Sequence, residues 1–291
     1  MHSKKINAPS VDYAVSKDGA KIGYKIFGEG KSAGIILVHG GLIYSQNFTV
    51  LAESLSSIFT VYVPDRRGRG LSHENNNHSL MVESEDIQAI IDKTNTENIF
   101  GLSSGAIVAI KTALGTSKLK KIAIYEPPIT DNWKISDKWY QNYELALHQN
   151  NYGKALIHIF KGLEEKSWMT IMPQFMVVPI LNFGIKSQKV DTDEVSLQEL
   201  ISLFRNDFRI AIESKGLIEQ CNKLKNRDIL LFEGEKSHKW LKEIVKTFVK
   251  KLPEAEHREL PKCVHHAADN TEKPHVVAEA LKDFFKKNQN P

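Results

Sequence analysis

Gly101-Leu102-Ser103-Ser104-Gly105 joins an apolar run of strand length to a helix, through a turn with a serine at its centre. The run covers residues 98–102, and residues 104–114 place small alanines at helical spacing. A G-x-S-x-G turn between a strand and a helix is typical of a nucleophile elbow, whose strained backbone lifts the serine hydroxyl above a sheet. Ser103 would then lie at the amino end of a helix, where free N–H groups favour developing negative charge.

Strand and helix patterns alternate on both sides of this turn. Before it, two short strands flank a turn within residues 11–27, and apolar runs follow at residues 34–39 and 59–63. After it, a further apolar run covers residues 121–125. Continuous runs rich in Ile and Val indicate strands buried on both faces. Their alternation with helices predicts an α/β fold with a mostly parallel central sheet flanked by helices.

The alternation stops at Pro127-Pro128 and resumes at residue 228. Between these points lie helical stretches rich in large apolar residues, with no pattern of a buried strand. An insertion of roughly a hundred residues is longer than an ordinary connection between elements. The sequence therefore predicts a core of residues 1–126 and 227–291, with residues 127–226 inserted as a helical cap.

Glycines follow the predicted strand at residues 34–39, in the sequence His39-Gly40-Gly41. A glycine at a strand end lets the backbone approach a bound molecule, and its N–H can point at an oxyanion. We expect the N–H groups of Gly41 and Ser104 to form an oxyanion hole, the largest electrostatic contribution in acyl transfer. His39 itself is expected to be structural.

Two adjacent histidines follow the last predicted strand, in Leu260-Pro261-Lys262-Cys263-Val264-His265-His266. Activation of a serine needs a base that takes and returns a proton near neutral pH, which is the range of histidine. The side chains of His265 and His266 cannot both face one nucleophile. The spacing alone leaves the choice between them open.

These motifs together resemble the α/β-hydrolase superfamily. They are the strand-end HGG, the DRRGRG turn that starts at Asp65, the GLSSG elbow, the YEPP sequence after the run at residues 121–125, and the LP-x-x-x-H ending. More narrowly, they are similar to bacterial hydrolases with a Y-E-P-P motif after the sixth strand. The resemblance implies an α/β-hydrolase fold, a structural role for Asp65, and His265 rather than His266 as the base.

The acid of the implied triad is the point at which the sequence departs from the common pattern. Most relatives carry an Asp two residues after the Gly-Glu that follows the seventh strand, but Gly234-Glu235 leads here to Ser237, which has no carboxylate. Haloalkane dehalogenases and zearalenone-type lactonases instead carry a Glu at the end of the sixth strand. Glu126 stands at that place and is the expected acid. Glu235, a cap residue or no acid at all are the alternatives.

The resemblance implies a serine hydrolase that cleaves a carboxylic ester, lactone or thioester. Dehalogenases attack with an aspartate, so a serine at the elbow implies acyl transfer and sets dehalogenation aside. We expect Trp133, Trp139 and Trp168, with nearby Phe and Met residues, to roof an apolar pocket for an apolar substrate. A C–C hydrolase or lyase, or a ligand-binding protein with vestigial catalysis, are the other readings of the same scaffold.

The composition excludes several other classes of function. The 291 residues carry a net charge of +4 with interspersed signs, which gives no basic stripe for nucleic acid. The two cysteines make no disulfide framework, and the N-terminus lacks the apolar segment of a secretory signal. No apolar run approaches membrane-spanning length. The sequence also contains no metal-ligand cluster or phosphate-binding loop, so we expect a cytoplasmic enzyme without a cofactor, in an oligomeric state that the sequence leaves open.

Overall fold

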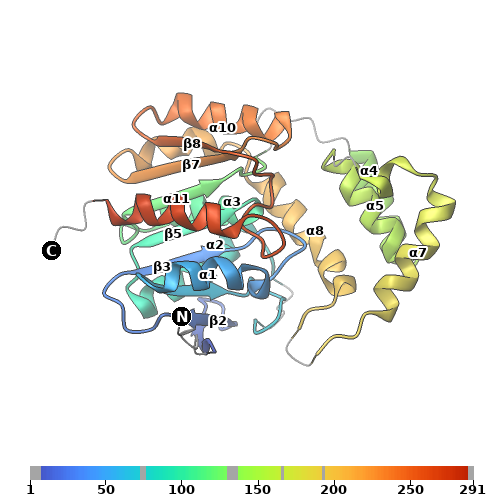
Figure 1. The fold of residues 1–291 in the computed structure, drawn as a ribbon, viewed down its shortest axis with the longest axis horizontal. Coiled ribbons are helices and arrows are strands. Elements are labelled where there is room, and N and C mark those ends of the chain that lie inside the picture. Colours follow the sequence, from blue (N-terminus) through green and yellow to red (C-terminus); the bar gives the residue numbers. More distant parts are fainter. Residues whose placement is uncertain (1–7, 73–76, 130–136, 165–166, 192–193, 288–291) are drawn as a thin grey trace, which may run out of the picture.

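A single twisted sheet runs through the computed structural model, which describes residues 8–72, 77–129, 137–164, 167–191 and 194–287 (Figure 1). Its strands are β1 (Ser10–Val15), β2 (Lys21–Phe27), β3 (Gly34–Val38), β4 (Thr60–Pro64), β5 (Asn98–Leu102), β6 (Lys121–Tyr125), β7 (Asp228–Gly234) and β8 (Glu256–Leu260). Their order in the sheet is β1-β2-β4-β3-β5-β6-β7-β8. The pairs β1–β2 and β2–β4 are antiparallel, and all later neighbours are parallel. The predicted α/β fold with a mostly parallel sheet is confirmed.

Helices cover both faces of this sheet, which explains the continuous apolar runs. One face packs against α2 (Leu80–Thr94), α3 (Ser104–Gly115) and α10 (Lys239–Lys251), and the other packs against α1 (Thr49–Ser56) and α11 (Pro274–Lys286). Successive strand residues alternate between the two apolar cores, so Ile99 faces the first and Phe100 the second. Since both faces are covered, β5 and β6 are buried at every position.

The described residues between β6 and β7 form helices joined by loops, and none of them lies in a strand. It contains α4 (Asp137–His148), α5 (Tyr152–Gly162), α6 (Trp168–Ile171), α7 (Gln174–Ser187), α8 (Leu197–Glu213) and α9 (Leu217–Gln220). Helices α4, α5 and α7 stand beside the sheet in Figure 1 and share a core with α8 that includes Tyr143, Ile159 and Phe204. This is the helical insertion that the sequence predicts.

Helix α8 belongs to both parts of the molecule. Its residue Phe204 packs in the cap core, whereas Ile210 and Ala211 pack in the core of the sheet. The cap is therefore joined to the sheet through a continuous helix, and the exact limits of residues 127–226 as a domain stay a prediction. Within the described ranges, no helix is long and apolar enough to cross a bilayer.

Candidate active site

Ser103 lies in a strained turn between β5 and α3. Its backbone angles are φ 56° and ψ −125°, a region that costs a non-glycine residue on the order of 1–3 kcal/mol. The turn is held by the Ser103 N–H, which donates to the carbonyl of Tyr125 at 2.9 Å. The neighbouring glycines permit this close packing: a Cβ at Gly105 would lie 2.2 Å from the carbonyl oxygen of His39, and one at Gly101 would lie 2.6 Å from that of Gly105. The backbone at Ser103 is thus strained, and this strained turn presents the Ser103 hydroxyl group.

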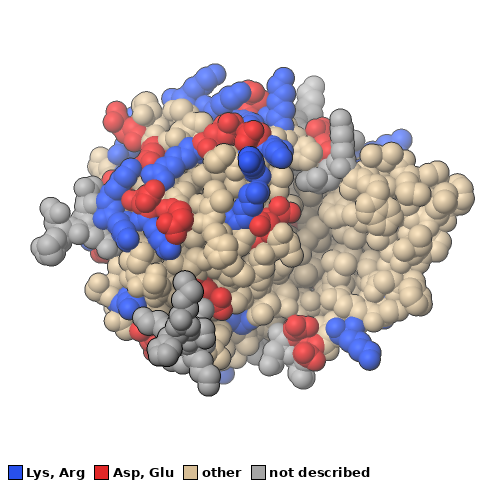
Figure 2. Space-filling view, viewed as in Figure 1, with Lys and Arg blue, Asp and Glu red and all other residues tan. Residues whose placement is uncertain are grey.

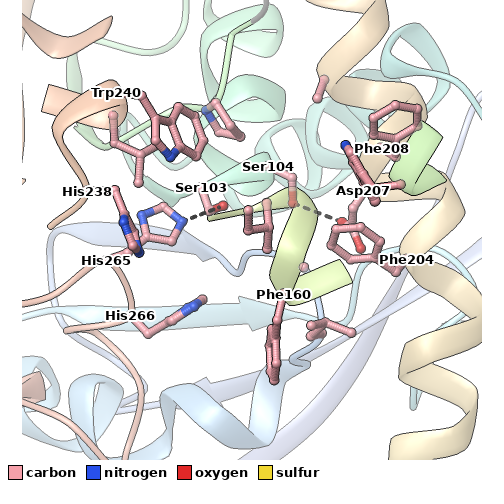
Figure 3. Close-up of a pocket in the computed structure, with 17 residues that line it drawn as sticks. Ser103, Ser104, Phe160, Phe204, Asp207, Phe208, His238, Trp240, His265 and His266 are labelled. Carbon is pink, nitrogen blue, oxygen red and sulfur yellow. Dashed lines mark hydrogen bonds between the residues drawn. The ribbon is translucent and has the colours of Figure 1, made fainter. Parts of the chain in front are cut away.

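His265 contacts Ser103 on one side and Glu126 on the other. Its Nε2 lies 3.0 Å from the Ser103 Oγ (Figure 3). Its Nδ1 lies 2.7 Å from Oε2 of Glu126. The loop that carries His265 is anchored by the hydroxyl of Tyr125, which donates to the carbonyl of Val264 at 2.8 Å. The structure therefore brings three residues from three distant parts of the chain into one line of hydrogen bonds.

Glu126 is completely buried directly after β6. Its second carboxylate oxygen, Oε1, accepts the N–H of Gly234 at 2.7 Å, so both oxygens have partners. Glu126 also has a positive φ of 43°, which shows that the backbone bends sharply to turn this carboxylate toward the histidine. Glu235, the alternative acid, instead accepts the N–H of Lys262 at 2.7 Å.

His266 does not take part in this line, although its ring lies 4.9 Å from that of His265. Burial, together with the neighbouring charge of His265, lowers the pKa of His266 to about 3. His39 is equally unsuited to proton transfer near pH 7, because burial lowers its pKa well below the usual range. Its Nε2 accepts the N–H of Arg66 at 3.1 Å.

Gly41 and Ser104, the expected oxyanion-hole residues, line the same cavity as Ser103. Ser104 is the first residue of α3, so its N–H has no partner within the helix. Its hydroxyl donates to Asp207 of α8 at 2.9 Å and accepts from Arg66 at 2.9 Å. A Cβ on Gly41 would lie 3.1 Å from the same Asp207 carboxylate. Asp207 therefore packs against both residues.

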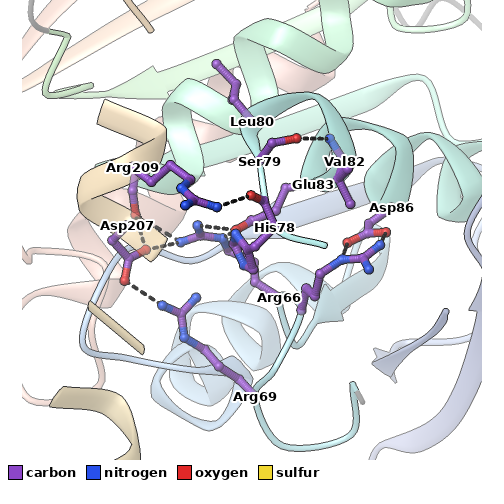
Figure 4. A network of polar contacts seen from close by, with 12 residues as sticks. Arg66, Arg69, His78, Ser79, Leu80, Val82, Glu83, Asp86, Asp207 and Arg209 are labelled. Carbon is purple, nitrogen blue, oxygen red and sulfur yellow. Dashed lines mark hydrogen bonds and ion pairs between the residues drawn. The ribbon is translucent and has the colours of Figure 1, made fainter. Parts of the chain in front are cut away.

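Asp207 belongs to a buried charge network that joins the cap helix α8 to the core (Figure 4). It pairs with Arg66 at 2.7 Å and with Arg69 at 2.5 Å, and Arg66 also pairs with Glu83 at 2.6 Å. Burial alone would raise the pKa of Asp207, but the charges of Arg69 and Arg66 outweigh it and lower that pKa. The positive charges of the two arginines balance the negative charges of Asp207 and Glu83. Asp207 therefore adds no net negative charge beside Ser104.

The DRRGRG turn supplies these arginines and is closed by Asp65. The Asp65 carboxylate accepts the N–H of Ser45 at 2.8 Å and that of Leu71 at 3.0 Å. Asp207 is not among the site residues predicted from the sequence. One feature of the sequence does point to such a residue: the three arginines of the DRRGRG turn lie beside a buried strand end and need acidic partners from elsewhere in the chain.

Two cavities share His265 in their walls. The inner one, of about 70 Å³, contains Ser103 and has walls that are mainly apolar. Those walls include Trp139, Phe160, Leu163, Phe204, Phe208, Trp240 and Leu241. The outer one, of about 360 Å³, is more open and has polar groups at its rim, among them Lys236, His238 and Glu272. Phe160, His238, His265 and His266 line both cavities.

The tryptophans are distributed differently from the expected roof. Trp139 lines the inner cavity, but Trp168 is half exposed on α6 and is not among the residues of either cavity wall. Trp168 is the first residue of the four-residue helix α6, and its neighbours Ser167 and Met169 line the outer cavity instead. Trp240, which is not part of the cap, also lines the cavity from the first turn of α10. Trp133 lies outside the described residues.

The described residues contain no group of three or more His, Cys, Asp or Glu side chains arranged to hold a metal ion. The site itself offers a hydroxyl, an imidazole within reach of it, a buried carboxylate, and N–H groups at a helix start.

Comparison with known proteins identifies the family. A family model described as "alpha/beta hydrolase fold" matches residues 35–270. The uncharacterized hydrolase YraK of Bacillus subtilis (strain 168) is 29% identical over 116 residues, a match that spans 38% of this chain and only 42% of that protein. An alpha/beta hydrolase from Sphaerobacter thermophilus DSM 20745 superimposes with a TM-score of 0.73 at 22% identity, covering 94% of this chain and all of the other. The enol-lactonase of Burkholderia xenovorans LB400 superimposes with a TM-score of 0.69 at 18% identity, covering 95% of this chain and all of the other. At these identities the two structures establish the fold alone.

Proposed function

We propose, given that this chain belongs to the α/β-hydrolase fold family, that it cleaves a carboxylic ester, lactone or thioester of an apolar small molecule through a Ser-His-Glu triad. The observation that carries the proposal is the line of hydrogen bonds from Ser103 through His265 to Glu126, at 3.0 and 2.7 Å. Each distance suits proton transfer or orientation without further movement. The likeness to an enol-lactonase structure agrees with the lactone option.

In the proposed mechanism, the Ser103 Oγ attacks the carbonyl carbon while Nε2 of His265 takes the hydroxyl proton. Glu126 holds the ring so that Nδ1 carries its proton and Nε2 is free to accept, and it stabilises the imidazolium that forms. The N–H groups of Gly41 and Ser104 stabilise the oxyanion. His265 then gives its proton to the leaving alcohol or thiol, and a water molecule repeats the cycle on the acyl-enzyme to release the acid.

The two cavities suggest how a substrate is oriented. Gly41 and Ser104 line only the inner cavity, so the carbonyl and the acyl group belong there. The leaving group must receive its proton from His265, which also lines the outer cavity. We therefore assign a short apolar acyl group to the inner cavity and a larger, more polar alcohol to the outer one. A lactone would span both.

The test is turnover of p-nitrophenyl esters of increasing acyl length, and of simple lactones, by the wild type and by Ser103→Ala. We expect kcat/KM to be highest for short acyl chains and to be lost in the variant. A correctly folded wild type that turns over none of these substrates would argue against the proposal. It would favour a C–C hydrolase, a lyase or a binding protein on the same scaffold.

A further inference from the structure

Helices α6 and α7 present an unusually apolar outer surface. Among the described residues, fourteen large apolar side chains are exposed, and seven of them lie on or next to these two short helices. We call these seven the apolar cap face: Trp168, Ile171, Met172, Phe175, Met176, Ile180 and Phe183. Such a concentration is not the ordinary scatter of single apolar residues on a surface.

The residues of this face are contiguous rather than scattered. On α7, Phe175, Met176, Ile180 and Phe183 follow helical spacing and fall on one side of the helix. The opposite side carries the buried Val177 and Ile185. Phe175 and Phe183 are 79% and 75% exposed, so both rings point outward.

Helix α7 is firmly attached to the rest of the cap. Asn182 accepts the N–H of Gly153 on α5 at 2.8 Å and donates to Asn151 at 2.9 Å. A Cβ on Gly153 would lie 2.8 Å from Leu181, so the two helices are in close contact. The apolar cap face is therefore held on a rigid support, and its exposure does not follow from a loosely packed helix.

A helix that is apolar on all sides is normally buried on all sides. Helix α7 has 14 residues, too few to span a membrane, and the segment from residue 168 to residue 187 contains one charged residue, Lys186. A lipid surface calls for Lys and Arg around the apolar centre, and a single lysine does not supply them. Figure 2 shows the cap side of the molecule largely free of charged residues, in contrast to the densely charged sheet side.

The size and neutrality of this face match a second copy of the same chain. With fully exposed areas on the order of 200 Å² per large side chain, the seven residues expose roughly 800 Å². A stable interface of standard size buries about 800 Å² on each partner. Two uncharged, Met- and Phe-rich faces related by a twofold axis complement one another without like-charge repulsion, and homodimer interfaces have this composition.

We infer that the apolar cap face is the interface of a homodimer in which α6 and α7 of one copy pack against α6 and α7 of the other. This inference is independent of the proposed catalytic chemistry. It nevertheless places the interface beside the site, because Met169 of α6 lines the outer cavity.

The test measures the mass of the full chain by sedimentation equilibrium at concentrations from 1 to ~100 μM, a range wide enough for the micromolar affinities common at this interface size. We expect twice the chain mass of 32.9 kDa for the wild type. The double variant Phe175→Glu, Phe183→Glu should dissociate at least about 100-fold more readily, because both changes bury a charge at the centre of the interface. Leu145→Glu on α4 is the matched control, since Leu145 is 52% exposed but outside the face, and it should remain dimeric.

A second measurement does not depend on the charged variants folding well. Both native cysteines are buried, so Phe183→Cys provides a single exposed thiol. A short bismaleimide should cross-link this variant to a covalent dimer, whereas the Leu145→Cys control should form no covalent dimer. A wild type that is monomeric throughout, or a dimer that persists in the folded double variant, would overturn the inference. A monomer that binds phosphatidylglycerol vesicles through this face would also overturn it and assign the face to lipid.

Discussion

Replacing Glu126 by glutamine tests the least common feature of the proposed site. In the structure, Oε2 faces the Nδ1 of His265 and Oε1 accepts the N–H of Gly234, both at 2.7 Å. Glutamine offers one oxygen and one NH₂ group to these two donors. If the NH₂ group faces His265, Nδ1 must become the acceptor, and the proton moves to Nε2, which then cannot take one from Ser103.

The other orientation of the amide is also unfavourable. If the oxygen faces His265, the NH₂ group opposes the N–H of Gly234 and leaves a buried donor without a partner, which costs about 1–3 kcal/mol. Both orientations also lose the negative charge that stabilises the imidazolium. We therefore expect kcat to fall by about 10³–10⁴ with little change in KM, as is typical when a triad carboxylate becomes an amide.

The assay is steady-state hydrolysis of a short-chain p-nitrophenyl ester, with thermal unfolding to verify that the variant is folded. Glu235→Gln is the matched control and should keep kcat within about twofold, because Glu235 binds the backbone of Lys262 instead. A folded Glu126→Gln variant that keeps more than a tenth of the wild-type kcat would refute the reasoning. A large loss in Glu235→Gln alone would move the acid to that residue.

Two further predictions concern stability. Asp207→Asn removes the charge that pairs with Arg66 and Arg69. Urea unfolding should show a free energy of unfolding that is lower by about 3–5 kcal/mol. A loss below about 1 kcal/mol would show that the network contributes little to stability. His39 stays neutral in the folded protein because burial lowers its pKa below 6.5. In the unfolded chain the same side chain takes up a proton, so the free energy of unfolding must fall as the pH decreases below about 6.5. Replacing His39 by glutamine should remove up to about 1.4 kcal/mol per pH unit from this slope in urea titrations between pH 7.5 and 5, and an unchanged slope would contradict the assignment.

The sequence was informative wherever one local pattern determines one element. Continuous apolar runs predicted the parallel strands, because strands covered on both faces have no polar side. The glycines around Ser103 predicted the elbow, because only glycine fits the close approach to the carbonyl of His39. The resemblance to relatives with a Glu after the sixth strand implied Glu126 as the partner of His265, and the structure brings the two into contact. That this contact serves catalysis remains a prediction.

The sequence was uninformative wherever a position depends on how the cap packs on the core. Asp207 lies far along the chain from Ser104, and only the docking of α8 brings them together. From the sequence, every large apolar residue of the cap was a candidate for the wall of the pocket. Trp139 lines the cavity, whereas Trp168 faces outward, because hydrophobicity alone does not distinguish an inner wall from an outer surface.

The most direct test of the proposed site is labelling of the intact protein with a fluorophosphonate probe, followed by mass spectrometry of its peptides. We expect a single adduct on Ser103 in the wild type and in His266→Ala, and a rate of labelling reduced by at least about 100-fold in His265→Ala, where the base is missing. A folded wild type that forms no adduct, or one that is labelled equally fast without His265, would contradict the claim that this imidazole activates this serine.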